Sequence, residues 1–306
     1  MTKVLLATDK PFAPVAVAGI QEICDKAGLE LVKLEKYKSP EEFKAAVKGI
    51  TAIIVRSDIV DKAIIDASDA LRIIVRAGAG YDNIDLAAAS AKKIVVMNTP
   101  GQNANAVAEL AVGMMIYLNR NGFNGTSGIE LRGKKLGIHG YGHIGKILAQ
   151  IGKGLGMKVY AHDPFVDKVL IENDGVVCEA DVKDLYRKCQ YVSVNIPANS
   201  QTKNSINFDL LNTMPEGATL VNTARKEIID EAGLLNIFEK RPDFRYVSDV
   251  APDNTEQLKK MFDGRFFFTP KKMGAQTAEA NTNAGLAAAR QIVGFIKDGD
   301  TTFKVN

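Results

Sequence analysis

The chain has 306 residues, 46% of them hydrophobic and 25% charged, which is typical of a soluble globular protein with one large domain or two of ordinary size. Its formal net charge of +3 is too small to indicate a nucleic-acid-binding protein. No stretch approaches the ~20 consecutive apolar residues of a membrane helix, and Asp9, Lys10 and Pro11 interrupt the apolar N-terminus, which argues against a signal peptide. We therefore expect a cytoplasmic protein that binds neither nucleic acid nor membrane.

Five short apolar runs in the first hundred residues predict buried strands, and segments with helical spacing separate them. Such alternation is typical of a parallel sheet built from βαβ units. The runs are KVLLAT from position 3, LELVKL from 29, TAIIVR from 51, LRIIVR from 71 and KIVVMN from 93.

A second set of strands follows an apolar helix expected at 104–120 and a loop rich in glycine and asparagine at 121–128. Its six apolar runs cover 134–140, 157–163, 191–197, 218–224, 244–250 and 265–270, and a last helix is expected at 277–299. Two such sets predict two doubly wound parallel-sheet domains. Small-molecule sites tend to form between domains.

A glycine-rich turn joins a strand to a helix in the second set. Gly140, Gly142 and Gly145 match GxGxxG, in which the glycines allow a tight turn, close approach of a pyrophosphate and tight helix packing. Asp163 ends the next strand, where an acid accepts ribose hydroxyls and disfavours a 2′-phosphate, so NAD is expected rather than NADP. A turn that serves packing alone is the alternative. His143 and His162 flank this site and are expected to be contacts or surface groups rather than catalysts.

The three cysteines, Cys24, Cys178 and Cys189, are odd in number and lack the spacing of metal ligands. We expect reduced thiols and no metal site. The chain also lacks low-complexity tracts and short repeats.

Several segments together resemble the D-2-hydroxyacid dehydrogenase family, and within it the phosphoglycerate dehydrogenases. They are RAGAGYDNIDL at 76–86, MNTPGQNANAVAEL at 97–110, the glycine turn, VNTARKEIIDEAGL at 221–234, SDVAPDN at 248–254 and TPKKMGAQT at 269–277. The resemblance implies a flavodoxin-like substrate domain formed by residues 1–99 and 284–306. It also implies a Rossmann NAD-binding domain at 100–283 and a homodimer. Beyond the glycines and Asp163, it assigns cofactor contacts to His143, Ile144, Pro197, Thr223 and Asp249.

Arg225 directly follows a predicted buried strand, at the end where ligands bind in doubly wound sheets. A guanidinium can grip the planar carboxylate of a 2-hydroxy or 2-oxo acid with two parallel hydrogen bonds and polarise the neighbouring carbonyl. A structural salt bridge with Glu227 or Asp230 is the alternative. The family resemblance favours the substrate role.

The chain departs from the family at the acid–base pair, which is usually a histidine after the last strand and a glutamate that orients it. No histidine follows His162. The histidine's place falls on Lys271, counted from Pro270, or on Lys272, counted back from MGAQT, and Lys271 is slightly preferred. The glutamate's place falls on Asn254 or Glu256.

A lysine can carry the proton as a base if its pKa, about 10.4 when unperturbed, is lowered, and a protonated lysine can donate without such a shift. Two alternatives stay open: the lysines form an ordinary surface loop, or the protein is a non-catalytic NAD(H)-sensing binding protein.

Two further arginines each end a predicted buried strand of the first domain. Arg56 and Arg76 match phosphate contacts of phosphoglycerate dehydrogenases, and Gly78, Ala79 and Asn103 match further substrate contacts. The expected reaction is NAD-dependent oxidation of 3-phosphoglycerate to 3-phosphohydroxypyruvate, the step that leads into serine biosynthesis. The alternatives are a glyoxylate or hydroxypyruvate reductase or another D-2-hydroxyacid dehydrogenase. For the two arginines, the alternative is that one or both form salt bridges, for example with Asp58 or Asp82.

Overall fold

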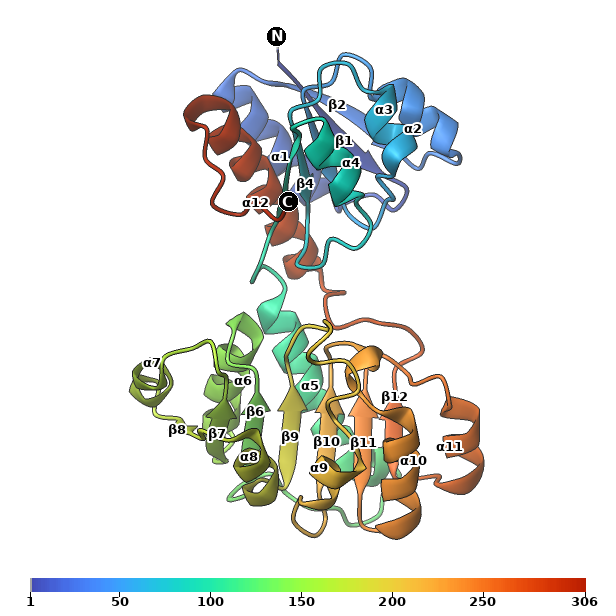
Figure 1. Cartoon of the computed structure of the whole chain (residues 1–306), viewed down its shortest axis with the longest axis vertical. Helices are drawn as coiled ribbons and strands as arrows, with labels where there is room; N and C mark the ends of the chain where they lie inside the picture. The colour runs from blue at the N-terminus through green and yellow to red at the C-terminus, as the bar shows by residue number, and fades with distance from the viewer. Residues whose placement is uncertain (1) are drawn as a thin grey trace. The chain divides into compact units, whose positions relative to one another are not determined.

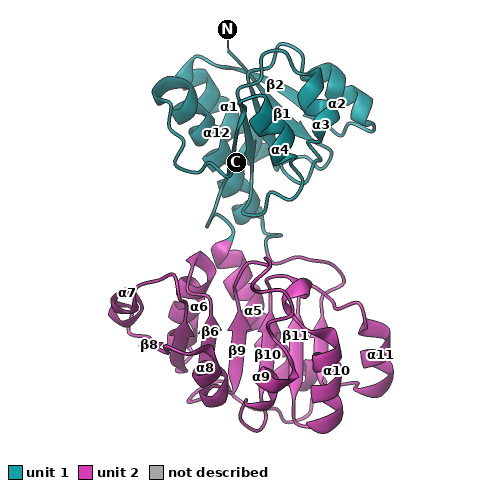
Figure 2. Cartoon of the chain, viewed as in Figure 1, with its two compact units in different colours: residues 1–103, 275–306 teal, residues 104–274 magenta. Residues whose placement is uncertain are grey.

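The computed structural model describes residues 2–306, and the chain divides into two compact units (Figure 2). Unit 1 takes the residues up to Asn103 together with Ala275–Asn306, and unit 2 takes Ala104–Gly274. The sequence analysis placed the two domain boundaries after residues 99 and 283. The structure places the second boundary before the last helix, α12 (Ala278–Asp298), so the whole of that helix belongs to unit 1.

Unit 1 contains a five-stranded sheet in the order β2-β1-β3-β4-β5, with all pairs parallel (Figure 1). The strand order reverses at β1, as in flavodoxin-like sheets. The strands match the five apolar runs: β1 Lys3–Thr8, β2 Glu30–Glu35, β3 Ala52–Val55, β4 Ile73–Arg76 and β5 Val95–Asn98.

Helices cover both faces of this sheet because successive side chains of a buried strand point to opposite faces. In β1, Val4 and Leu6 pack in one core with α1 (Pro14–Ala27) and α12. Leu5 and Ala7 pack in a second core with α2 (Pro40–Ala46) and α3 (Lys62–Ala67), and α4 (Leu86–Ala91) covers the same face.

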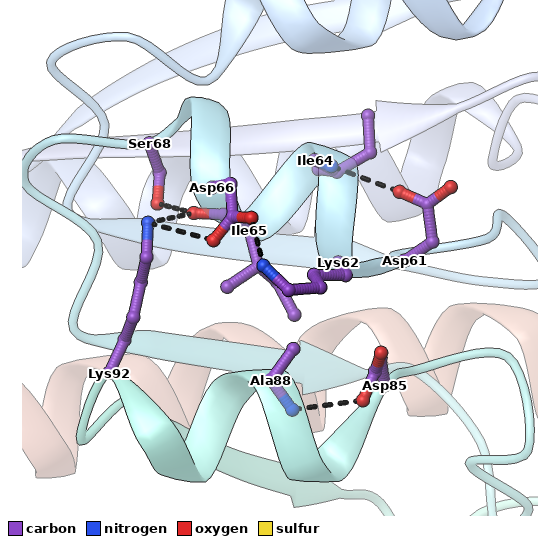
Figure 3. A network of polar contacts seen from close by, with 9 residues as sticks. All are labelled: Asp61, Lys62, Ile64, Ile65, Asp66, Ser68, Asp85, Ala88 and Lys92. Atoms are coloured by element: carbon purple, nitrogen blue, oxygen red, sulfur yellow. Dashed lines mark hydrogen bonds and ion pairs between the residues drawn. The ribbon is translucent and has the colours of Figure 1, made fainter.

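Two of these helices are only six residues long and depend on their caps (Figure 3). Asp61 and Asp85 each accept a hydrogen bond from the backbone N–H three residues later, at 2.9 Å in both cases. Asp66 pairs with Lys62 of its own helix and with Lys92, which follows α4, at 3.4 Å. The same carboxylate therefore ties α3 to the end of α4.

Unit 2 contains a seven-stranded parallel sheet in the order β12-β11-β10-β9-β6-β7-β8. Its order reverses between β6 and β9, which is the Rossmann arrangement. The strands are β6 Lys135–His139, β7 Lys158–His162, β8 Val177–Cys178, β9 Tyr191–Val194, β10 Thr219–Asn222, β11 Arg245–Ser248 and β12 Phe266–Phe268. The sequence predicted six of them and missed β8, which has only two residues.

The helices of unit 2 also form a layer on each face of the sheet (Figure 1). On one face α5 and α6 pack together, and on the other α8 and α10 pack over β9 and β10. The helices are α5 Ala104–Asn119, α6 His143–Gly154, α7 Lys168–Asn173, α8 Val182–Lys188, α9 Phe208–Asn212, α10 Glu231–Lys240 and α11 Thr255–Met261, with 3-10 turns at Asn121–Phe123 and Lys226–Ile228. The predicted class, two doubly wound parallel-sheet domains, is confirmed.

Between residues 2 and 306, none of the helices has both the length and the apolar character needed to span a bilayer. Within the same range, no three histidine, cysteine, aspartate or glutamate side chains lie close enough together to hold a metal ion.

Candidate active site

The three glycines of the turn between β6 and α6 have three separate physical reasons. Gly140 has a φ of +98°, and a Cβ there would lie 2.9 Å from the carbonyl carbon and oxygen of Asn195. A Cβ on Gly145 would lie 2.4 Å from the Gly140 carbonyl oxygen, so α6 packs directly on the turn. A Cβ on Gly142 would meet nothing within 4 Å. Two glycines therefore allow close packing, and the third keeps the start of α6 open.

The start of α6 is arranged for an anion. Gly142 is its N-cap and provides no side-chain hydrogen bond, so the first N–H groups and the positive end of the helix dipole face outward. His143 is exposed and Ile144 is half-buried in this first turn. Asp163 follows β7, and its two carboxylate oxygens accept hydrogen bonds from the backbone N–H groups of Tyr141 at 2.7 Å and Phe165 at 2.9 Å. The predicted ribose acceptor is thereby fixed beside the turn.

His139 and His162 lie at the ends of β6 and β7, with ring centroids 5.9 Å apart. His139 Nδ1 lies 3.3 Å from the Tyr186 hydroxyl, and His162 Nδ1 donates to the Glu179 carbonyl at 2.9 Å. Burial, with a smaller contribution from His162, lowers the pKa of His139 to about 4. His139 is therefore neutral near pH 7 and is held as part of the core, which leaves the acid–base role to another residue.

Two buried polar atoms directly after the carboxyl ends of β10 and β11 have no hydrogen-bond partner within the described chain. They are Oγ1 of Thr223 and Oδ1 of Asp249, whose side chains are 6% and 0% exposed. A buried polar atom without a partner is costly, and it commonly marks the place of a ligand. Pro197, which follows β9, is exposed. With the glycine turn and Asp163, these groups fit a dinucleotide, and Asp249 would hold an amide of its nicotinamide end.

Arg225 lies between β10 and the 3-10 turn that follows, and its side chain is half-buried. Its Nη1 donates to the Ala224 carbonyl at 3.0 Å, and its own carbonyl accepts from Nδ2 of Asn222 at 3.1 Å. Lys272 Nζ donates to the same Ala224 carbonyl, also at 3.0 Å. The two cationic groups thus meet on one oxygen, within about 6 Å of each other, which is the range of direct electrostatic interaction.

The loop that carries both lysines is tied to β11. The Thr269 hydroxyl donates to the carbonyl of Lys271 at 2.8 Å. Oδ2 of Asp249 accepts from the N–H of Gly274 at 2.7 Å and from that of the residue before it at 3.3 Å. Burial raises the pKa of Asp249, while those N–H groups and the charges of Lys272 and Arg225 lower it. The side chains of Lys271 and Lys272 are both exposed.

The two positions considered for the family glutamate point elsewhere. Asn254 Nδ2 donates to the carbonyl of Glu231, at the start of α10, at 3.3 Å, and its backbone N–H donates to the Glu231 carboxylate at 3.2 Å. Glu256 is exposed and pairs with Lys259 one helical turn away, at 2.7 Å. The carboxylate that acts electrostatically on Lys272 is instead Asp249.

A small pocket in unit 1 brings together most of the predicted substrate residues. Arg76 Nε donates to the carbonyl of Arg56 at 3.0 Å, so the two arginines are linked. Ala79 lies outside the pocket lining, and its carbonyl accepts from Asn98 at 2.6 Å. The lining comprises the predicted Arg56, Arg76, Gly78 and Asn103, with Ser57, Ala77, Ala275, Gln276, Ala280, Asn281 and Ala284. The sequence analysis missed Gln276 and Asn281, whose only signal is that they are polar residues at the start of an alanine-rich helix.

The glycine turn predicts opposite effects for two alanine substitutions. Gly142→Ala should keep stability to within about 1 kcal/mol, because its Cβ meets nothing within 4 Å and only a helix cap is weakened. It should reduce NADH affinity, because a pyrophosphate needs close approach to the backbone at the start of α6. Gly145→Ala should destabilise by about 1–3 kcal/mol because its Cβ overlaps the Gly140 carbonyl. Urea unfolding and NADH titration test both. Equal stability losses would contradict this account of the turn.

The buried His139 predicts acid sensitivity of the fold. The unfolded chain takes up the histidine proton at about pH 6.5 and the folded protein only at about 4, so stability should fall as the pH drops from 6.5 towards 4. His139→Gln removes this linkage and should flatten the dependence of the thermal midpoint on pH in that range. If wild type and variant lose stability in parallel between pH 7 and 5, another group is responsible.

Comparison with known proteins agrees with this geometry. The model of the D-isomer specific 2-hydroxyacid dehydrogenase NAD-binding domain matches residues 85–270. The D-3-phosphoglycerate dehydrogenase of Archaeoglobus fulgidus is 36% identical over 299 residues, which cover 89% of this chain and 54% of that protein. The hydroxypyruvate reductase of Thermotoga maritima is 32% identical and is covered to 95% of its length, with 91% of this chain aligned. The chain spans about half the length of the curated phosphoglycerate dehydrogenases that it matches.

Among solved structures, the NAD⁺-bound 3-phosphoglycerate dehydrogenase of Entamoeba histolytica aligns with a TM-score of 0.88 and 48% identity, over 100% of this chain and 98% of that one. The D-lactate dehydrogenase of Escherichia coli aligns with a TM-score of 0.81 at 23% identity, which shows the shared fold alone. The family resemblance noted in the sequence is confirmed: this chain belongs to the D-isomer specific 2-hydroxyacid dehydrogenase family and contains its NAD-binding domain.

Proposed function

We propose that the chain is an NAD-dependent dehydrogenase that interconverts 3-phosphoglycerate and 3-phosphohydroxypyruvate, with the oxidation leading into serine biosynthesis. One observation carries the proposal: Arg225 and Lys272 both donate to the Ala224 carbonyl, beside the buried Asp249 with its unpartnered Oδ1. Several curated relatives and the Entamoeba histolytica structure are phosphoglycerate dehydrogenases, which supports the choice of substrate.

In this proposal each group has one task. Arg225 holds the substrate carboxylate with its guanidinium and polarises the oxygen at C2. Lys272 takes the hydroxyl proton onto Nζ during oxidation and returns it during reduction. NAD, which the glycine turn, Asp163 and Asp249 would hold, would supply the hydride acceptor for C2, so the oxidation of the alcohol to a ketone would need no further oxidant.

We assign the proton to Lys272 rather than to Lys271, which the count from Pro270 favoured. Both side chains are exposed, but Lys272 Nζ shares a carbonyl acceptor with Arg225, whereas the Lys271 carbonyl is held by the Thr269 hydroxyl. A sensor that only binds NADH has no evident need for a carboxylate clamp and a second cation on the same oxygen. The homodimer implied by the family stays a prediction, and the sedimenting mass of the purified protein tests it.

The far end of the substrate is assigned to the arginine pocket of unit 1. A phosphoryl group carries about two negative charges and three acceptor oxygens, which suits two linked guanidinium groups. The competing function is reduction of unphosphorylated hydroxypyruvate or glyoxylate, favoured by the relative from Thermotoga maritima that this chain matches along 95% of its length.

The lysine assignment predicts a clear difference between neighbours. Lys272→Ala should lower kcat by about 10²–10⁴, the usual contribution of a general acid or base, with little change in NADH affinity. Lys271→Ala is the matched control and should stay within about threefold of wild type, because the side chain that donates to the Ala224 carbonyl beside Arg225 is that of Lys272. The assay follows NADH oxidation with 3-phosphohydroxypyruvate. Near-full turnover by both variants would remove the lysines from the mechanism.

The substrate assignment predicts a preference that the same assay measures. Wild-type protein should use 3-phosphohydroxypyruvate with a kcat/KM at least about tenfold above that for hydroxypyruvate, since charged hydrogen bonds to the phosphoryl group are gained. Comparable values would make the protein a reductase of simple oxo acids. NADH binding without turnover of either acid would make it a binding protein.

A further inference from the structure

The arginine pocket of unit 1 contains a residue that neither the family resemblance nor the sequence pattern assigned. Asn281 lies in the first turns of α12, and its two amide atoms have fixed partners. Its Nδ2 donates to the Thr277 carbonyl at 2.7 Å, and its Oδ1 accepts from Nη2 of Arg56 at 2.6 Å. The first bond fixes which atom faces the arginine, because a carbonyl can only accept.

The rest of the Arg56 guanidinium is held in the same way. Nη1 donates to the carbonyls of Lys10 at 3.0 Å and Pro11 at 3.2 Å, and the group lies over the Phe12 ring at 5.1 Å. All these acceptors are neutral oxygens. They therefore fix the orientation of the guanidinium while leaving its positive charge uncompensated by them.

The Asp58 carboxylate, which acts electrostatically on Arg56, accepts hydrogen bonds from other groups. Asp58 is 5% exposed, and its Oδ1 accepts from the backbone N–H of Asp9 and the Tyr37 hydroxyl, both at 2.7 Å. Its Oδ2 accepts from the backbone N–H of Arg56 at 3.3 Å. Burial lowers the pKa of Arg56, while the carboxylates of Asp58 and Asp9 act in the opposite direction. The pocket therefore holds a partly desolvated cation.

We propose that Asn281 is a positioning residue for substrate choice: its neutral oxygen aims the Arg56 guanidinium into the pocket without neutralising it, so that the pocket accepts the phosphoryl end of the substrate. Arg76, linked to the Arg56 carbonyl, completes the anion site. An aspartate at this position would keep an acceptor on Nη2 but would add the opposite charge, which favours an unphosphorylated acid. This inference deepens the proposed function and rests on it for the identity of the anion.

Asn281→Asp keeps an oxygen acceptor for Arg56 Nη2 but adds a negative charge, so it tests the effect of charge separately from that of the hydrogen bond. The variant protein should bind 3-phosphoglycerate at least about tenfold more weakly in the presence of NADH, because a new ion pair competes with the phosphoryl group. Its affinity for D-glycerate should change less than about twofold, since that acid has no far-end charge. Asn283→Asp, an exposed position two residues along α12, is the matched control for the added charge and should leave both affinities unchanged. Isothermal titration of the full chain measures the affinity of each of the two variants for each of the two acids.

A second variant controls for the possibility that Asn281→Asp disturbs the local structure. Asn281→Ala removes the acceptor without adding charge and should weaken 3-phosphoglycerate severalfold while leaving D-glycerate and the thermal midpoint close to wild type. If Asn281→Asp and Asn283→Asp bind 3-phosphoglycerate alike, or if both acids weaken equally, Asn281 has no role in selecting the anion. That result would leave the proposed dehydrogenase intact, provided wild-type protein turns over 3-phosphohydroxypyruvate. Wild-type protein that binds the two acids equally would overturn both the inference and the substrate assignment.

Discussion

All seven strands of unit 2 run parallel, and the arrangement of the candidate site depends on this constraint. Parallel strands deliver the residues that follow them to the same edge of the sheet. Gly140, Asp163, Thr223, Asp249 and Thr269 each follow a strand directly, although more than a hundred residues separate the first from the last. The glycine turn, Asp163, the segment after β10 that contains Arg225 and the loop after β12 that contains the two lysines therefore gather at one edge, although they lie far apart in the sequence.

Asp249 connects two parts of that edge at a cost in free energy. Burial disfavours its charged form, as the raised pKa shows, and the carboxylate is retained because Oδ2 accepts the N–H groups of the lysine loop. Gly274 is needed for that approach, since a Cβ there would lie 2.9 Å from the same oxygen. One buried carboxylate thus fixes the loop that carries Lys272, while its other oxygen has no hydrogen-bond partner within the described residues. Such a stability cost at a functional site is common in enzymes.

Sequence reasoning found the features that depend on local pattern. Apolar runs predicted eleven of the twelve strands, and the glycine spacing predicted the turn, because burial and backbone conformation leave a direct trace in residue type. It missed β8, whose two residues are too short to form a pattern. It also could not separate Lys271 from Lys272, since the choice depends on which Nζ reaches the Ala224 carbonyl, nearly fifty residues away in the chain. The contact of Asn281 could not be predicted for the same reason, because its partner Arg56 lies 225 residues away in the chain.

In both units, backbone carbonyls accept hydrogen bonds from cationic side chains. Arg225 and Lys272 donate to the Ala224 carbonyl, and Arg56 donates to the carbonyls of Lys10 and Pro11. A backbone carbonyl orients a cation through its dipole but contributes no net charge, so the field that an anionic substrate meets is preserved. At Arg56, a carboxylate in place of the Asn281 amide oxygen would orient the guanidinium more strongly and would oppose that field. The neutral acceptors around Arg56 therefore position the guanidinium and leave it attractive to an anion in the pocket of unit 1.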